Sequence, residues 1–207
     1  MKNVNVNLLP EFVLCVGPMW SGKTTKLVSI IERYGYQNSV AKNICSPKIK
    51  IACFKPLSDS RYSSDKIVTH SGLSIDAIPV KSADEIAEFI KNEKPNIVAV
   101  DEAFMIEGLS SVLIEAYWTG ISIYVSSIDL LANLEPCKEI AKMMPYATKI
   151  IKCTSVCESC GNDAHYTSKK VSTANEITVG GADIYKPSCL YCHAEYAPLL
   201  HLPYRLR

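Results

Sequence analysis

A glycine-rich stretch near the N-terminus constrains the fold more than any other part of this sequence. Residues 12–16, Phe-Val-Leu-Cys-Val, form a short apolar run that is typical of a buried parallel strand. The next eight residues, Gly17 to Thr24, match the pattern G-x-x-x-x-G-K-[ST] at every fixed position. A helix is expected to begin at Lys23, so strand, loop and helix follow one another as a P-loop requires.

The P-loop pattern predicts a phosphate-binding site. Its glycines allow the backbone to turn N–H groups inward on a polyphosphate. Lys23 is placed to reach the β- and γ-phosphate oxygens, and Thr24 can offer its hydroxyl to Mg²⁺. The alternative is a glycine-containing turn that matches by chance, and the expected strand before it and helix after it argue against that.

Apolar runs of strand length alternate with segments of helical periodicity over the first 150 residues. This alternation predicts an α/β fold, a P-loop NTPase-like parallel sheet with helices on both faces. The first helix is expected to end near Gly35 and to be followed by a loop, and residues 82–85 match a capping box. The expected strands span 12–16, 49–54, 97–102, 121–125 and 148–153, and the expected helices 23–35, 82–94, 109–118 and 135–144.

Two adjacent carboxylates, Asp101 and Glu102, end the strand expected at 97–102. Ligands gather at the carboxyl edge of such sheets, and in P-loop enzymes an Asp there helps to hold Mg²⁺ beside the loop hydroxyl. Asp101 is therefore expected to pair with Thr24. Neighbouring strand residues point in opposite directions, so if Asp101 faces the metal, Glu102 is expected to face away from it, where a carboxylate near the γ-phosphate can accept a proton from a hydroxyl or water. The alternative is a strand that ends in solvated acids.

Two C-x-x-C pairs lie 28 residues apart in the C-terminal part of the chain. Four thiolates complete the tetrahedral coordination of Zn²⁺ and leave no position for water, so the set predicts a structural metal site. Coincidental spacing, a redox pair and substitution of one ligand by His193 are the alternatives. The predicted zinc ligands are Cys157, Cys160, Cys189 and Cys192.

The same region loses helical periodicity and gains Gly, Ser, Thr and Asn. This change predicts two units, a P-loop domain over 1–153 and a small zinc-binding lobe with a lid and a C-terminal tail over 154–207. A lobe of this size builds little hydrophobic core and needs a metal to fold.

Charge and hydropathy argue against several classes of protein. With 22 Lys and Arg against 21 Asp and Glu, the net charge is +1, which gives no electrostatic footprint for nucleic acid or for an anionic membrane. The segment between the cysteine pairs is equally balanced, which argues against a zinc ribbon that tracks phosphates. No apolar stretch approaches the ~20 residues that cross a bilayer, and residues 1–7 do not resemble a signal peptide, so a cytoplasmic protein is expected.

Further motifs join these in an order that resembles a known family. They are Asp59-Ser-Arg-Tyr-Ser63, Thr69-His70, Val100-Asp-Glu-Ala103 and Val179-Gly-Gly-Ala-Asp-Ile-Tyr185. With the P-loop and the cysteine pairs, they cover the chain from about 12 to 192 and resemble the type II thymidine kinases, the cytosolic group found in animals, bacteria and large DNA viruses.

The resemblance implies transfer of the γ-phosphoryl group of ATP to the 5′-hydroxyl of thymidine, with deoxyuridine as a second candidate. It implies Glu102 as general base and Arg61 as a catalytic residue beside the phosphates. The family is usually homotetrameric and often inhibited by thymidine triphosphate. The residues implied in holding ATP and Mg²⁺ are Gly17, Pro18, Met19, Trp20, Ser21, Gly22, Lys23, Thr24, Thr25, Asp59 and Asp101, of which Thr24 and Asp101 would hold the Mg²⁺.

A lasso over about 166–187 is implied to close on the nucleoside mainly through its backbone. Tyr185 would lie against the sugar and base, and Met19 would approach the thymine methyl group. The residues implied in nucleoside binding are Met19, Phe104, Ala132, Thr167, Glu176, Ile177, Thr178, Val179, Gly180 and Tyr185.

The sequence departs from the family pattern at a few positions. Phe104 stands where the family commonly has Gln, Ala132 where an aromatic residue is usual, and Trp20 where Phe is usual. The segment 37–48 is also longer than the family pattern. These differences bear on base recognition more than on phosphate chemistry. Two alternatives stay open, a P-loop ATPase whose zinc module binds a macromolecule and an inactive family member that only binds nucleotides.

Overall fold

A parallel sheet forms the centre of the computed structural model, which describes residues 9–43, 48–59, 63–170 and 180–193. Its strand order is β5-β2-β6-β7-β1-β8, and every neighbouring pair is parallel. The α/β fold predicted from the sequence is therefore confirmed. The strands are β1 (Phe12–Val16), β2 (Ile51–Pro56), β5 (Ile78–Val80), β6 (Ile97–Val100), β7 (Ser122–Ser127) and β8 (Lys149–Lys152).

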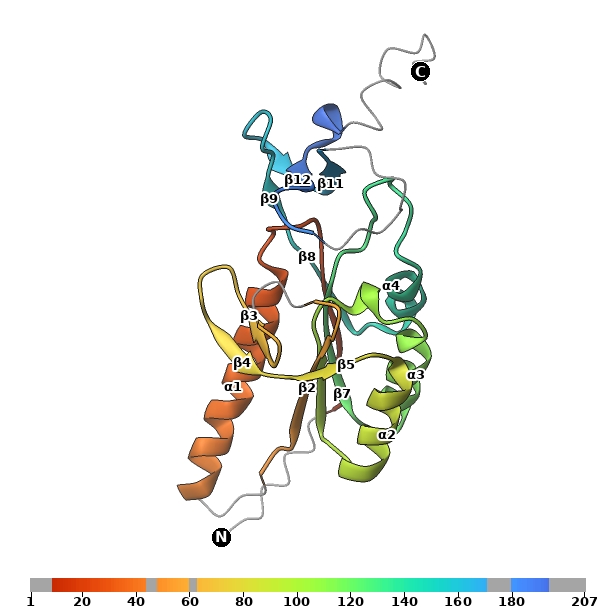
Figure 1. Ribbon diagram of the computed structural model, residues 1–207. Helices are drawn as coiled ribbons and strands as arrows, with labels where there is room; N and C mark the ends of the chain where they lie inside the picture. Colours follow the sequence, from red (N-terminus) through yellow and green to blue (C-terminus); the bar gives the residue numbers. More distant parts are fainter. Residues whose placement is uncertain (1–8, 44–47, 60–62, 171–179, 194–207) are drawn as a thin grey trace.

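Helices cover both faces of this sheet. One face carries α1 (Lys23–Asn43), and the other carries α2 (Ala83–Glu93), α3 (Leu109–Trp118) and α4 (Lys138–Met143) (Figure 1). Because successive strand residues point to opposite faces, Leu14 packs in the core beneath α2–α4 and Val13 in the core beneath α1. All five residues of β1 are buried, as expected for a strand covered on both sides.

The first helix is longer than its sequence predicted, so the loop expected at 37–48 was wrong over residues 37–43, whereas residues 44–47 lie outside the described part of the chain. The helix continues past Gly35 to Asn43. A Cβ at Gly35 would meet nothing within 4 Å, so this glycine occupies an open helical position and does not end the helix. The added turns are fixed by Asn38, whose amide donates to the Ile49 carbonyl at 2.8 Å and accepts the Ile49 N–H at 2.7 Å.

Two helix starts also differ from expectation. Helix α4 begins at Lys138, because Pro136 pairs with Leu130 in an isolated β-bridge before the helix. Ser82 precedes α2 but makes no side-chain capping bond, and Glu85 accepts the N–H of Lys81 instead. The predicted capping box is therefore not formed, although the helix begins where expected.

Short strands from the C-terminal part of the chain lie beyond the carboxyl edge of the sheet (Figure 1). Strands β9 (Ser155–Val156) and β10 (Asp163–Ala164) form one antiparallel pair, and β11 (Tyr166–Lys169) and β12 (Tyr185–Ser188) form another. A hairpin of β3 (Lys66–Val68) and β4 (Ser74–Asp76) packs near α1. Three short 3-10 helices complete the described elements: η1 (Ala103–Met105), η2 (Met144–Tyr146) and η3 (Leu190–Cys192).

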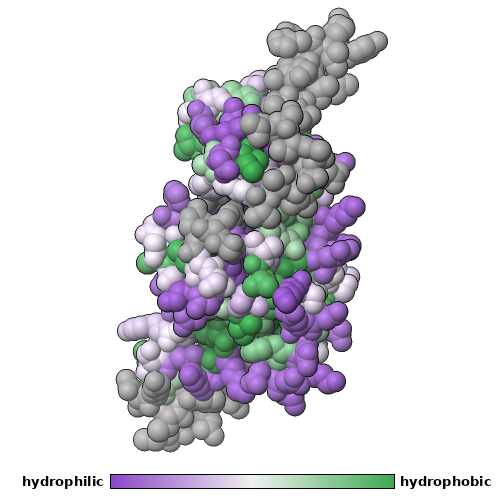
Figure 2. All heavy atoms as spheres, in the orientation of Figure 1, coloured by the Kyte–Doolittle hydropathy of each residue, from purple (hydrophilic) through white to green (hydrophobic). Residues whose placement is uncertain are grey.

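The surface of the α/β body is mixed in character. Figure 2 shows hydrophilic residues over much of its described part, with smaller hydrophobic areas between them. Among the residues that the structure describes, no helix combines the length and the apolar character that crossing a bilayer requires.

Candidate active site

The loop between β1 and α1 requires glycine at one position and favours it at another. Gly17 has a φ of 148°, and a Cβ there would clash with the backbone oxygen of Cys153. Gly22 has a φ of 77°, in the left-handed region that favours glycine. Its carbonyl accepts the N–H of Lys26 at 3.0 Å and so begins the hydrogen bonding of α1. The loop therefore leads directly into the helix N-terminus, where an anion is stabilised.

Lys23 is buried at the head of α1. Its ammonium group donates a hydrogen bond of 2.6 Å to the carbonyl of Pro18 within the same loop. Burial lowers the pKa of Lys23, and the charges of Glu102 and Asp101 oppose that effect. A polyphosphate in the loop would give this ammonium a charged partner in place of a neutral carbonyl.

Thr24 and Asp101 are brought together as the sequence predicted. The Thr24 hydroxyl donates to Asp101 and lies 3.1 Å from Oδ1 and 3.3 Å from Oδ2. Burial, and next the charge of Glu102, raise the pKa of the Asp101 carboxyl to about 7. A bound cation would favour the ionised carboxylate and offset both effects. Because hydroxyl and carboxylate oxygens are the ligands that Mg²⁺ prefers, this pair fits the ion.

Glu102 lines the same pocket as Asp101, although adjacent residues of an extended strand would point in opposite directions. The reason lies in the backbone. Strand β6 ends at Val100, and Glu102 adopts a left-handed conformation, with a φ of 49° and a ψ of 41°, before η1. The alternation of an extended strand no longer applies there, and both carboxylates reach the pocket.

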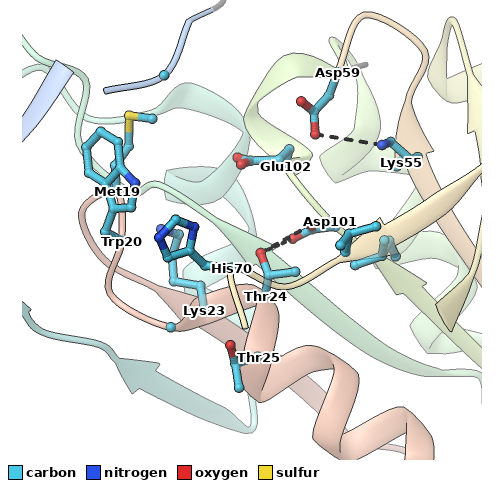
Figure 3. Close-up of a pocket in the computed structure, with 14 residues that line it drawn as sticks. Met19, Trp20, Lys23, Thr24, Thr25, Lys55, Asp59, His70, Asp101 and Glu102 are labelled. Carbon is cyan, nitrogen blue, oxygen red and sulfur yellow. Dashed lines mark hydrogen bonds and ion pairs between the residues drawn. The ribbon is translucent and has the colours of Figure 1, made fainter. Parts of the chain in front are cut away.

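Lys55 and Asp59 form another wall of this pocket (Figure 3). Lys55, near the end of β2, is 4% exposed and lies 4.0 Å from the Asp59 carboxylate. Its ammonium group also donates to the carbonyls of Ser63, at 2.7 Å, and Lys66, at 3.2 Å. The buried ammonium group of Lys55 thus connects the segment after β2 to the start of β3 and fixes the position of Asp59.

The four predicted zinc ligands meet in the C-terminal part of the chain. Their sulfur atoms all lie within 4.8 Å of one another, and the sulfurs of Cys160 and Cys189 are 3.6 Å apart. Zinc–sulfur bonds of about 2.3 Å in a tetrahedron place sulfur atoms about 3.8 Å apart, so the cluster fits a structural Zn²⁺. His193 is not in this group; its Nε2 instead lies 3.2 Å from the carbonyl oxygen of Thr167.

The C-terminal lobe touches the P-loop at two points. The N–H of Met19 donates to the Thr167 hydroxyl at 3.0 Å, and the Ser155 hydroxyl donates to the Trp20 carbonyl at 3.2 Å. Gly181 also lines the pocket. The phosphate loop is therefore held between the sheet and the lobe.

Comparison with known proteins agrees with these motifs. The family described as thymidine kinase matches residues 11–193. A thymidine kinase of Pseudothermotoga lettingae is 32% identical over 189 residues, which cover 90% of this chain and 96% of that protein. The chain belongs to the thymidine kinase family. The family resemblance inferred from the sequence is thus confirmed.

Most of the residues that family membership implicates in phosphate binding and catalysis gather in one pocket (Figure 3). Their individual roles stay predictions. The predicted residues that line it are Met19, Trp20, Gly22, Lys23, Thr24, Thr25, Asp59, Asp101 and Glu102. Gly17, Pro18 and Ser21 belong to the same loop without lining the pocket, and the Ser21 hydroxyl donates to Pro18 at 2.8 Å.

Several residues predicted to bind nucleoside lie elsewhere or are not described. Phe104 packs against the hydrophobic core, and its N–H donates to the Ser127 hydroxyl at 3.1 Å. Ala132 is half-buried in the turn after β7, Tyr185 is buried at the start of β12, and Gly180 precedes it; none of them lines the pocket. The residues that lie outside the described part of the chain are Arg61, Glu176, Ile177, Thr178 and Val179.

Two polar residues that line the pocket had no role predicted for them from the sequence. Lys55 directly follows an apolar run that ends at the carboxyl edge of the sheet. Ligands gather at that edge, so a lysine there was the sequence signal that could have identified it. His70 was noted only as part of a motif, and it reaches the pocket from the turn between β3 and β4.

Proposed function

We propose that this chain transfers the γ-phosphoryl group of ATP to the 5′-hydroxyl of thymidine, with deoxyuridine as a second acceptor. Membership of the thymidine kinase family supports the reaction class. The observation that carries the proposal is the pocket at the head of α1, where the Thr24–Asp101 pair and the Glu102 carboxylate line the same space.

The phosphate end of the pocket would be formed by residues 17–25. The loop backbone and the Lys23 ammonium would hold the polyphosphate, and Asp59 would lie beside it. Thr24 and Asp101 would hold Mg²⁺, which when bound neutralises charge on the phosphate oxygens. Arg61 would offset charge on the transferred group.

Glu102 would act as the general base. Its carboxylate would accept the proton of the 5′-hydroxyl while the 5′-oxygen forms a bond to the γ-phosphorus and the bond to the bridging oxygen of ADP breaks. The products are the nucleoside monophosphate and ADP. The left-handed backbone at Glu102 supports this role, since it turns the side chain into the pocket.

The nucleoside would lie between the P-loop and the C-terminal lobe. Met19 would approach the thymine methyl group, and its contact with Thr167 supports a place for both beside the base. Tyr185 and the segment 176–180 would close over the nucleoside, and Phe104 and Ala132 would shape the base pocket from behind. Closure would exclude water, which otherwise competes as acceptor.

Further parts of the proposal rest on family membership. The chain would divide into a kinase domain over 1–153 and a zinc-binding, lid-carrying lobe over 154–207. It would work in the cytoplasm as a homotetramer that does not bind nucleic acid or membranes, with ATP and thymidine as its partners. Thymidine triphosphate is the candidate feedback inhibitor.

A nucleoside panel tests the proposal. The purified protein is incubated with ATP and Mg²⁺ and with each natural nucleoside in turn, and the product is identified by mass. Thymidine monophosphate formed together with ADP supports it. ADP release without a nucleoside would indicate an ATPase, and no ADP release in the presence of measurable ATP binding would indicate an inactive nucleotide-binding relative.

A further inference from the structure

We propose that His193 is a positioning residue that connects the cysteine cluster to the P-loop. Its ring holds the backbone of Thr167, and the hydroxyl of Thr167 in turn holds the N–H of Met19. The expected change in nucleoside kinetics when His193 is replaced rests on the proposed function. The expected change in hydrogen exchange at the Met19 N–H does not.

His193 is fully buried, with 0% of its surface exposed, and directly follows the cluster residue Cys192. The carbonyl oxygen of Thr167 can only accept a hydrogen bond, so the ring nitrogen Nε2, at 3.2 Å, carries the proton. The ring also meets that of Tyr166 edge to face, with centroids 5.9 Å apart. A buried imidazole aimed at a backbone carbonyl fixes the position of that strand.

Thr167 takes part in two hydrogen bonds, one through its carbonyl and one through its hydroxyl. It is 4% exposed, its carbonyl faces His193, and its hydroxyl accepts the N–H of Met19 at 3.0 Å. Met19 lies 148 residues earlier in the chain, within the P-loop. The position of this hydroxyl therefore sets where the loop backbone lies.

The strand that carries Thr167 needs such an anchor. Within the described residues, β11 pairs with β12 in a two-stranded sheet whose contacts with β9 and β10 come mainly from β12, and a two-stranded ribbon by itself is only marginally stable in water. A metal bound by Cys192 would fix the chain at His193, and His193 would pass that constraint to β11. The zinc cluster would thus order the loop that contacts nucleotide and nucleoside as well as the lobe itself.

Hydrogen exchange at the Met19 amide tests this connection in the zinc-loaded, full-length protein. His193→Phe keeps an aromatic ring beside Tyr166 but removes the donor, and His193→Leu is a second donor-free variant. His193→Gln restores an N–H. Tyr191→Ala is the matched control, because Tyr191 lies in the same turn and is 72% exposed.

We expect the Met19 amide to exchange about tenfold faster in His193→Phe, with zinc content unchanged, and to return to within about twofold of wild type in His193→Gln. The KM for thymidine should rise about tenfold in His193→Phe while kcat changes less than about twofold. Tyr191→Ala should match the wild type throughout.

Two results would overturn the inference. Loss of zinc from folded His193→Phe or His193→Leu would make His193 a metal ligand, and unchanged Met19 exchange in either variant would show that no constraint passes through Thr167. If the wild type phosphorylates no nucleoside, the proposed function fails, and the exchange measurement still decides the connection.

Discussion

At the scale of single residues, buried charge is concentrated around the pocket. Lys23, Lys55, Asp59 and Asp101 are each less than 10% exposed. Burying charged groups lowers stability unless they are paired, and clusters of buried, perturbed charges are typical of functional sites. The raised pKa of Asp101 has the same origin, because burial and a like charge both disfavour its ionised form.

Lys55→Met tests whether this buried ammonium fixes the segment after β2. The variant loses hydrogen bonds to two carbonyls and the pairing with Asp59, so we expect the free energy of unfolding to fall by about 2 to 4 kcal/mol. Urea unfolding measures it. Lys66→Met is the matched control, since its partner Asp76 is almost fully exposed and the change should cost less than ~0.5 kcal/mol. Equal effects of the two substitutions would refute the role of Lys55.

Functional residues that belong to short sequence motifs could be predicted from the sequence. Residues whose role depends on contacts made by the folded chain were missed. The P-loop, Asp101 and the cysteine pairs are encoded by short spacings, so they could be located. Lys55 could not be assigned, because its partner carbonyls depend on how the segment after β2 folds back. Glu102 was located, but its backbone conformation could not be predicted, because a left-handed residue after a strand has no clear sequence signal.

At the scale of elements, the length of α1 shows how weak a helix-stop signal a single glycine is. Gly35 and Gly120 look alike in sequence, yet the chain continues as a helix through the first and turns at the second with a φ of 94°. The difference depends on residues further along, since Asn38 anchors the later turns to Ile49.

Alanine substitution at Gly35 and at Gly120 tests whether the first residue is helical and the second is left-handed. Gly35→Ala should raise the free energy of unfolding by about 0.5 to 1 kcal/mol, because alanine favours helix and its Cβ meets open space. Gly120→Ala should lower it by about 1 kcal/mol, because its φ lies in the left-handed region. Thermal and urea unfolding measure both. A destabilised Gly35→Ala would mean that α1 ends where the sequence suggested.

Glu139 joins α4 to the start of α3 and predicts a pH dependence. Its carboxylate accepts the Ser110 N–H at 2.8 Å and pairs with Lys142 at 3.2 Å. Burial alone raises the pKa of Glu139, but these partners outweigh it and hold the pKa below its ordinary value of 4.5. Its contribution to stability is therefore present above pH 4.5 and is lost as the pH falls through the lower folded-state pKa.

Glu139→Gln should lower the free energy of unfolding at pH 7 by about 1 to 2 kcal/mol, and the gap to wild type should close in acid. Urea unfolding across the pH range measures this. Lys142→Met, which removes only the more exposed partner, should cost less than ~1 kcal/mol. A gap that stays constant with pH would contradict the assignment to the carboxylate.

At the scale of the whole molecule, the pocket depends on segments that lie far apart in the chain. It draws on the P-loop, the end of β2, the β3–β4 turn, the residues after β6 and Gly181 of the C-terminal lobe. Because β1, β2 and β6 are parallel strands of one sheet, the P-loop, the end of β2 and the residues after β6 lie at the same edge, which the sequence pattern could predict. The contact between lobe and P-loop could not be predicted, because it joins Met19 to Thr167 across 148 residues.

Cys160→Ser tests whether the lobe depends on its metal. Loss of one ligand should abolish stoichiometric zinc and reduce soluble yield, since metal binding and folding of a small lobe are coupled. Metal content of the purified protein measures it. Cys53→Ala, in the core beneath α1, should keep full zinc. A Cys160→Ser protein with full zinc content would show that this thiol is not a ligand.

The central claim is that Glu102 deprotonates a nucleoside hydroxyl in front of a nucleotide held by the P-loop. The most direct measurement compares thymidine monophosphate formation and ATP affinity in wild type, Glu102→Gln and the exposed control Glu107→Gln. The account predicts that Glu102→Gln lowers kcat by ~10² or more while ATP affinity changes less than about threefold, with the control unchanged. Near-normal turnover by Glu102→Gln would contradict it.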